Sequence, residues 1–183
     1  MPSRNHALRG FTLIELMVVL AVAAVLLALA VSSWNDAVAA TRSGDARARL
    51  YQSLLAADNH ATAAGVEVVV CASADGATCS GSPEWTRGWI SFVDLDGDRK
   101  PGKQERVLRR EPALEGSTRL RSTKGRTRLL FHAFGGTPGS NVTFTLCDDR
   151  GVDKATTIVM ANTTRLRQDK PTAKAARECV ESG

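Results

Sequence analysis

A twelve-residue stretch in the middle of the chain has the residue types and spacing of a cation-binding loop. It carries carboxylates at positions 1, 3, 5 and 12, which are Asp94, Asp96, Asp98 and Glu105. Calcium loops of the EF-hand type place ligands at these positions, but they need a glycine at position 6 for the sharp turn. Here position 6 is Arg99, and Lys100 and Lys103 dilute the negative charge. We therefore interpret the stretch as a polar hairpin loop and expect no metal, with a calcium site as the alternative.

Another candidate functional carboxylate, Glu15, lies in an apolar stretch of the sequence near the N-terminus. The 21 residues from Phe11 to Val31 are apolar apart from Thr12 and Glu15. An ionised carboxylate within a bilayer costs about 2.5–3.5 kcal/mol and calls for a cationic partner. If the chain were cut after Gly10, the new amine of Phe11 in one subunit could pair with Glu15 of another. The alternative is a carboxylate that is protonated or extends to the membrane edge.

The sequence around this carboxylate resembles a known processing signal. Residues 9–16, Arg-Gly-Phe-Thr-Leu-Ile-Glu-Leu, are similar to the prepilin signature of type IV pilins and type II secretion pseudopilins. The resemblance implies that a prepilin peptidase cuts between Gly10 and Phe11 and methylates Phe11. It also implies that Glu15 guides docking into a growing filament, so that the partners are other pilins.

The apolar run predicts three parts of the chain. At about 1.5 Å per residue the run is roughly 31 Å long, enough to cross a hydrocarbon core. It exceeds the ~7–15 apolar residues of a secretory signal peptide. We expect a leader over residues 1–10, a transmembrane helix over 11–33 and an ectodomain over 34–183. The basic leader places the N-terminus in the cytoplasm and the bulk of the chain outside. Since the prepilin resemblance implies a bacterium, we expect a single-pass protein of the inner membrane with a periplasmic ectodomain.

The cysteines fit an oxidising compartment, because their spacing matches no metal or redox motif. There are four of them: Cys71, Cys79, Cys147 and Cys179. Four cysteines allow three pairings. A turn-rich segment separates the first two and suits a short closed loop, in which case the last two would tether the C-terminal tail to a strand.

The charge is unevenly distributed along the chain. Residues 1–98 carry 6 Lys/Arg and 10 Asp/Glu, whereas residues 99–183 carry 18 and 9. The second half therefore has a net charge of +9 and attracts polyanions such as DNA. Since few aromatic residues are available for base stacking, DNA contacts would be made to the backbone and be largely independent of sequence. A solvated basic face, or one that docks an acidic filament neighbour, is the alternative.

The residue pattern predicts one long helix followed by strands. From Phe11 to about Ala64 there is no proline, and apolar residues recur with helical spacing in the second half. After Gly65 the pattern turns to short β-rich runs separated by turns. The expected strands are 66–71, 88–93, 106–109, 118–121, 127–133, 141–147 and 155–161. This order predicts an α+β fold, in which a long N-terminal helix, membrane-spanning in its first half, packs on an antiparallel β-sheet ectodomain.

The ectodomain resembles the GspH/FimT group of minor pilins and pseudopilins. The resemblance rests on five segments in order: residues 88–94, 134–136, 143–148, 157–159 and 164–167. It implies a pilin-like fold, a place near filament tips and a role in starting assembly. In this group a C-terminal Gly-Arg-x-Arg element is associated with DNA binding, and the chain has Thr164-Arg165-Leu166-Arg167. The expected DNA-binding residues are Arg165, Arg167, Lys170 and Lys174.

No pattern in the chain indicates catalysis. His60 falls on the expected helix and His132 in an expected strand, and neither a P-loop nor an H-E-x-x-H motif occurs. We therefore expect a minor type IV pilin without cofactor, with a DNA-binding role in natural transformation. The alternative is a pseudopilin of a type II secretion machine with a purely structural role.

Overall fold

The computed structural model describes residues 12–139 and 141–182, without the side chains of residues 29–33. The chain divides into two compact units, Met1–Val38 and Ala39–Gly183. One long helix, α1 (Leu13–Ala64), contributes residues to both units. Its existence and its end before Gly65 confirm the sequence-based prediction. The start at Phe11 lies outside the described residues.

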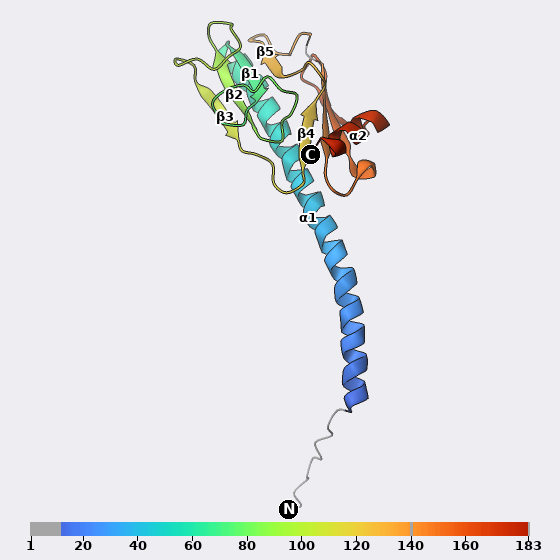
Figure 1. The fold of residues 1–183 in the computed structure, drawn as a ribbon. Coiled ribbons are helices and arrows are strands. Elements are labelled where there is room, and N and C mark those ends of the chain that lie inside the picture. The colour runs from blue at the N-terminus through green and yellow to red at the C-terminus, as the bar shows by residue number, and fades with distance from the viewer. Residues whose placement is uncertain (1–11, 140, 183) are drawn as a thin grey trace, which may run out of the picture. The chain divides into compact units, whose positions relative to one another are not determined.

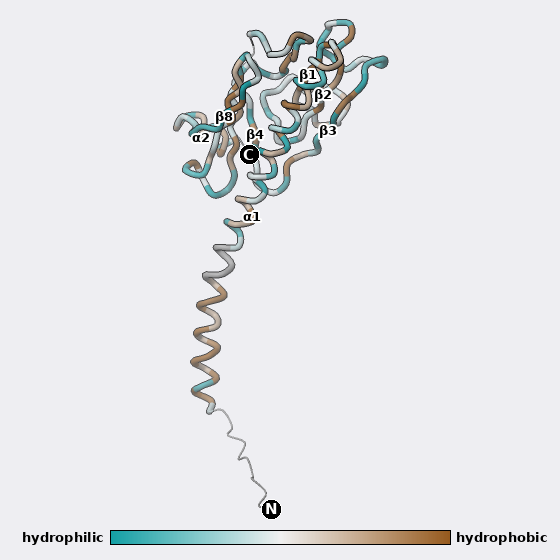
Figure 2. Tube along the Cα trace, turned by 180° about the vertical axis from the view of Figure 1, so that it is seen from behind, coloured by the Kyte–Doolittle hydropathy of each residue, from teal (hydrophilic) through white to brown (hydrophobic). Residues whose placement is uncertain are grey.

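The described part of the first unit, residues 12–38, is helical from Leu13 onward and has an exposed apolar surface. Its large apolar side chains from Leu13 to Leu27 are more than half exposed, and most of this segment is coloured as hydrophobic in Figure 2. Within the described residues, none of the helices combines the length and the apolarity needed to cross a bilayer.

Helix α1 ends before Gly65 because the backbone adopts a left-handed conformation at this residue. Gly65 has a φ of 65°, a left-handed conformation that glycine adopts without steric cost. The N–H of Val66 donates to the carbonyl of Ala61 at 3.2 Å, which satisfies one of the last helical carbonyls. The chain then enters the first strand.

The second unit contains two four-stranded antiparallel sheets (Figure 1). Sheet A has the order β3-β2-β1-β5, and sheet B has the order β4-β6-β7-β8. The strands of sheet A are β1 (Glu67–Ala72), β2 (Trp89–Asp94), β3 (Val107–Glu111) and β5 (Arg128–Phe131). Those of sheet B are β4 (Arg119–Ser122), β6 (Val142–Cys147), β7 (Thr156–Met160) and β8 (Leu166–Asp169).

A single apolar core lies between helix α1 and the two sheets of this unit. The helix contributes a stripe at three- and four-residue spacing: Ala46, Leu50, Leu54, Ala57 and Ala61. The sheets contribute alternating residues, such as Phe144 and Leu146 of β6, because successive strand side chains point to opposite faces. Among the described residues, every buried apolar side chain belongs to the second unit, so a fragment of residues 34–183 keeps the whole core.

Two disulfides match the pairing that the sequence favoured. Cys71 is bonded to Cys79, and Cys147 to Cys179. The second bond holds a C-terminal helix, α2 (Ala173–Glu181), against β6, and a 3₁₀ turn, η1 (Val152–Lys154), lies nearby. Helix α2 buries Ala176 and Cys179 beside Cys147 and Ala155.

One strand and one α-helix of the structure were not predicted from the sequence. Strand β8 was not predicted because its residues, Leu-Arg-Gln-Asp, are mostly polar and exposed, as an edge strand tolerates. Helix α2 was not predicted because it is only nine residues long. Its start is nevertheless a recognisable N-cap, in which the Thr172 hydroxyl accepts a hydrogen bond from the N–H of Ala175.

Candidate functional site

The turn between β7 and β8 determines how the two arginines of the Thr164–Arg167 element are presented. Thr164 has a φ of 58°, in the left-handed region that a β-branched residue rarely adopts. Its N–H donates to the carbonyl of Ala161 at 2.9 Å, and the N–H of Ala161 donates to the carbonyl of Arg165 at 3.0 Å. Thr164 therefore has the conformation that a glycine would favour at this position.

Asp58 of α1 anchors this turn together with a second loop. Its Oδ2 lies 3.0 Å from the Thr164 hydroxyl, and its Oδ1 accepts a hydrogen bond from the N–H of Gly136 at 3.3 Å. A Cβ on Gly136 would lie 2.8 Å from the carbonyl oxygen of Asn162, so the two loops meet only because this residue is glycine. Sequence reasoning missed Asp58, whose acidic side chain fits any exposed position of a helix.

Arg165 and Arg167 are exposed along the edge of sheet B. Arg165 directly precedes β8, and Arg167 pairs in register with Val159 of β7. The neighbouring residue Leu166 packs against the core, so Arg167 points to the outer face of the sheet. Neither arginine has an ion-pair partner within residues 12–139 and 141–182.

Lys170 and Lys174 extend this basic strip toward the C-terminus. Lys170 follows β8 and is exposed, whereas Lys174 lies on α2 and pairs with Glu178 at 3.8 Å. That pair is exposed and contributes little, about 0.3–0.5 kcal/mol, so Lys174 can exchange it for another anion. The structure thus places Arg167 on β8, Arg165 and Lys170 directly before and after this strand, and Lys174 on α2. We call Arg165, Arg167, Lys170 and Lys174 the basic strip.

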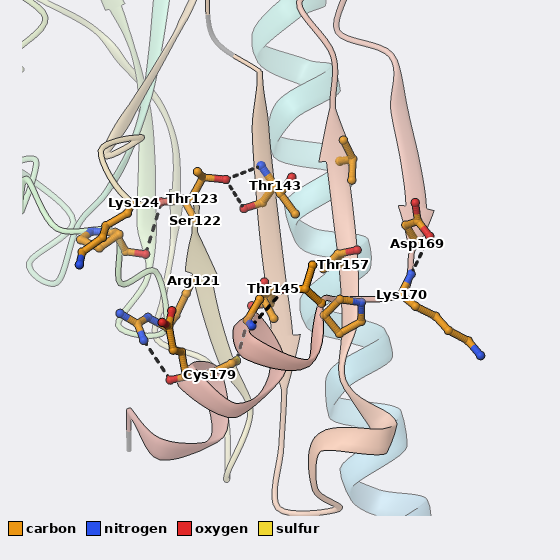
Figure 3. Close-up of a pocket in the computed structure, with 16 residues that line it drawn as sticks. Arg121, Ser122, Thr123, Lys124, Thr143, Thr145, Thr157, Asp169, Lys170 and Cys179 are labelled. Atoms are coloured by element: carbon orange, nitrogen blue, oxygen red, sulfur yellow. Dashed lines mark hydrogen bonds between the residues drawn. The ribbon is translucent and has the colours of Figure 1, made fainter.

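A groove of about 530 Å³ lies on the outer face of sheet B next to the basic strip. Figure 3 shows Thr143, Thr145 and Thr157 on adjacent strands at its floor, with Lys124 and Lys170 on opposite sides. Arg121 also lines it, but its guanidinium is engaged with Glu84 at 3.3 Å and with the Glu178 carbonyl at 3.0 Å. In Figure 3 the side chains of Lys124 and Lys170 extend outward from the two sides, so the groove itself offers mainly hydroxyl groups, with Asp169 and Glu178 also in its lining.

Two buried carboxylates connect α1 to the sheets. Glu111 of β3, with a side chain 7 % exposed, pairs with Arg49 at 2.8 Å and with Arg109. Asp148 pairs with Arg150 at 2.7 Å and accepts a hydrogen bond from Ser43. Burial raises the pKa of each carboxyl, but the hydrogen bonds from these partners outweigh it and hold both pKa values below their ordinary range. These groups have all their charge partners within the unit, so their role is structural.

Glu15 lies in the first turn of α1 and caps its own helix. Its Oε2 accepts hydrogen bonds from the N–H and the hydroxyl of Thr12 at 2.9 and 3.0 Å, and its N–H donates to the Thr12 hydroxyl at 3.3 Å. This reciprocal arrangement is a capping box, which stabilises a helix start. The predicted processing residues Gly10 and Phe11 lie outside the described residues.

The acidic stretch at residues 94–105 forms the loop between β2 and β3. Asp94 ends β2 and is buried, whereas Asp96 and Asp98 are exposed. Glu105 is half-buried at the far end of the loop, two residues before β3.

A long N-terminal helix that supplies part of the core of a two-sheet unit, together with an apolar N-terminal segment, defines the class of pilins and pseudopilins. Residues 46–164 match the family described as type II transport protein GspH, and residues 6–31 match the prokaryotic N-terminal methylation motif. The chain belongs to the GspH family of minor pilins and pseudopilins, which are structural subunits of filaments and not enzymes. No curated protein matches the sequence.

Solved structures with the same fold come from both kinds of filament. The type IV minor pilin FimU of Pseudomonas aeruginosa is 15 % identical, with a TM-score of 0.55 over 76 % of this chain and 92 % of that chain. The minor pseudopilin EpsH from the type II secretion system of Vibrio cholerae is 16 % identical, with a TM-score of 0.51 over 71 % of this chain and 98 % of that chain. At this level of identity the likeness concerns the fold.

Proposed function

We propose that this GspH-family subunit is a minor pilin of a type IV pilus that binds double-stranded DNA through the basic strip. A prepilin peptidase cuts the chain between Gly10 and Phe11 and methylates Phe11. The segment 11–33 anchors it in the inner membrane with the leader in the cytoplasm, and the ectodomain lies in the periplasm before it joins the pilus. There it helps to start filament assembly.

The N-terminal methylation motif supports the processing and assembly part of this proposal. The exposed apolar side chains of α1 between Leu13 and Leu27 supply a surface that lipid or neighbouring pilin helices would cover. Glu15 lies at the start of this surface, where its carboxylate can pair with the amine of a neighbouring subunit. The prepilin peptidase, the membrane and the other pilins are the partners that this arrangement requires.

The observation that carries the DNA-binding part is the geometry of the β7–β8 turn. Thr164 has a left-handed φ of 58°, a conformation that glycine adopts without steric cost, so its backbone conformation is one that a Gly-Arg-x-Arg element could also adopt. Both guanidinium groups are exposed and unpaired within the part of the chain that the structure describes. Exposed arginines on a strand edge can contact phosphates of a duplex without reading bases.

A salt titration of duplex binding tests this role. The fragment of residues 34–183 should shift DNA mobility at about 50 mM salt, with an affinity that falls steeply as salt rises. Replacing Arg165 and Arg167 together by glutamine should weaken binding and reduce the slope of log K against log salt by about 1.8, because each lost phosphate contact contributes about 0.9. The matched control is the Lys100→Gln/Lys103→Gln variant, which removes two exposed charges from the β2–β3 loop.

Two results would remove the DNA role from the proposal. One is the absence of a mobility shift at about 50 mM salt, where electrostatic contacts are strong. The other is an equal loss of slope in the arginine and lysine variants, which would mean that net charge alone attracts the duplex.

The second candidate function is that of a minor pseudopilin in a type II secretion machine. The family model that matches residues 46–164 is described as type II transport protein GspH, and this description favours it. In this role the ectodomain would contact only neighbouring subunits, and the basic strip would dock an acidic partner. Copurification with secretion pseudopilins rather than with sheared pili would favour this candidate.

A further inference from the structure

The loop between β2 and β3 contains a buried carboxylate with one unsatisfied oxygen. Asp94 is 4 % exposed. Its Oδ1 accepts hydrogen bonds from the N–H groups of Gly97 and Arg99 at 3.1 and 3.4 Å. Its Oδ2 is buried and has no hydrogen-bond partner among the described residues. A buried carboxylate oxygen without a donor is costly, so a ligand that supplies positive charge would stabilise it.

Two further carboxylates lie close to this one. One oxygen from each of Asp94, Asp96 and Asp98 lies within 4.8 Å of the other two. Calcium binds oxygen ligands at about 2.3–2.6 Å, so two oxygens on opposite sides of one ion are about 5 Å apart. The spacing of the three oxygens therefore suits a single ion of this size.

Turn formation alone does not account for the three acidic residues. Asp96 accepts a hydrogen bond from the N–H of Asp98, and Asp98 accepts one from Lys100, roles that asparagine fills equally well. The three carboxylates lie close together and one oxygen of the buried Asp94 has no hydrogen-bond donor among the described residues, so their negative charges repel one another. The cluster is thus unfavourable without a cation, although it is well placed to hold one.

The backbone of the loop also makes the sharp turn at position 6, although the glycine expected there is missing from the sequence. Position 6 of a calcium loop takes glycine because the chain turns sharply there. Arg99 occupies this position with a φ of 59°, in the left-handed region. The loop therefore adopts the required conformation without the glycine.

We propose that the β2–β3 loop is a calcium site. Four carboxylates and one backbone carbonyl are the candidate ligands: Asp94, Asp96, Asp98, Glu105 and the carbonyl of Lys100. Glu105 stands at position 12, and its two oxygens accept the N–H groups of Leu95 and Gly102 at 2.8 and 2.7 Å, which hold it across the loop. Lys100 stands at position 7, where loops of this spacing use a backbone oxygen.

The charges in the loop set the expected affinity. Three cations, Arg99, Lys100 and Lys103, oppose the four carboxylates, so binding is weak. We expect a Kd of about 10⁻⁴–10⁻³ M, the range of extracellular calcium modules. An ion bound there would fix the ends of β2 and β3 to each other and stabilise the edge of sheet A. This site is independent of the DNA-binding proposal.

Calorimetric titration of the full-length chain in detergent, after removal of metals with a chelator, tests the site. Calcium chloride should give one saturable binding event, and magnesium chloride should bind more weakly, because magnesium demands a smaller octahedral site. The Asp96→Asn/Asp98→Asn variant keeps the turn-forming acceptors but should lose binding. Asp153→Asn, which removes an exposed carboxylate from η1, is the matched control and should bind like the parent chain.

A gain-of-affinity variant and a stability measurement complete the test. Arg99→Gly removes a cation and suits the left-handed backbone, so it should bind calcium several-fold more tightly. Calcium at about ten times the Kd should raise the unfolding temperature of the parent chain and leave that of the double variant unchanged. Absence of both heat and a temperature shift in the parent chain, equal binding of magnesium, or unchanged binding in the double variant would each overturn the proposal.

Discussion

The strained threonine of the β7–β8 turn allows the cost of a conformation to be separated from the value of a hydrogen bond. Thr164→Val keeps the β-branched shape and the left-handed backbone but removes the hydroxyl that lies 3.0 Å from Asp58. Thr164→Gly removes the same hydroxyl and also the steric cost of a φ of 58°. The difference between the two variants therefore reports the strain.

General values for a charged hydrogen bond and for a left-handed residue give the size of both effects. A hydrogen bond to a charged group contributes about 1.5–3 kcal/mol, so Thr164→Val should lower the free energy of unfolding by that amount. The left-handed conformation costs a non-glycine residue about 1–2 kcal/mol, which Thr164→Gly recovers. We expect the glycine variant to fall about 1 kcal/mol below the parent and the valine variant about 2 kcal/mol below it. The hydroxyl also lies 2.7 Å from the Thr163 carbonyl and has one proton, so the valine effect is the loss of one hydrogen bond shared between the two acceptors and not of two full bonds.

Urea unfolding of the fragment of residues 34–183, with both disulfides intact, measures these differences. The salt slope of DNA binding in the same variants shows whether the turn geometry matters for function. A valine variant as stable as the parent would refute the hydrogen-bond argument. A glycine variant less stable than the valine variant would refute the strain argument, because glycine would then gain nothing from the positive φ.

Three further predictions follow from other parts of the structure. Glu15→Ala and Glu15→Gln should both be cleaved normally; if the charge guides docking, both should be depleted from sheared pili, and recovery of the glutamine variant would assign the role to helix capping. Glu111→Gln should cost about 3 kcal/mol of stability near neutral pH, because Arg49 and Arg109 both lose the buried carboxylate that they share, and the exposed Asp45 at 3.9 Å only partly replaces it for Arg49. The pKa of Glu111 in the folded chain lies below its ordinary value of 4.5, so the ionised carboxylate stabilises the parent chain above pH 4.5. This stabilisation is lost as the pH falls through the folded-state pKa. The free energy of unfolding, measured as a function of pH in acid, should show the loss in the parent chain but not in the variant. Replacing Cys147 and Cys179 by serine opens a loop with a sequence separation of 32 and should cost about 3–4 kcal/mol in urea unfolding, while a native hydrogen-exchange pattern in α2 would contradict its dependence on this bond.

The elements with a strong apolar period could be predicted from the sequence. Helix α1 shows its stripe from Ala46 to Ala61 at helical spacing, and β6 alternates between the core residues Phe144 and Leu146 and outward threonines. Seven of the eight strands lie within the expected runs or one to two residues from them. These elements bury an apolar face, and burial is the property that leaves a periodic trace in the sequence.

The elements without such a face could not be predicted. Strand β8 forms because β7 offers it an open edge, and this depends on long-range pairing rather than on its own four residues. Helix α2 is stable because a disulfide and a few buried residues hold it, since an isolated helix of this length is marginal in water. Pairing of the strands into two sheets also depends on contacts between distant residues.

The two proposed sites each have a non-glycine residue at a position where the corresponding sequence motif has glycine. Arg99 and Thr164 are the two non-glycine residues with positive φ among residues 12–139 and 141–182. An aspartate binds each of them: Asp94 accepts the N–H of Arg99, and Asp58 lies within hydrogen-bonding distance of the Thr164 hydroxyl. A hydrogen bond of this kind offsets the steric cost that glycine would have avoided, so the backbone keeps its turn while the sequence loses the signature. If this holds, Asp58→Asn, which weakens the bond at Thr164 without touching the arginines, should lower both the stability of the fragment and its DNA affinity, whereas it should leave calcium binding at the β2–β3 loop unchanged.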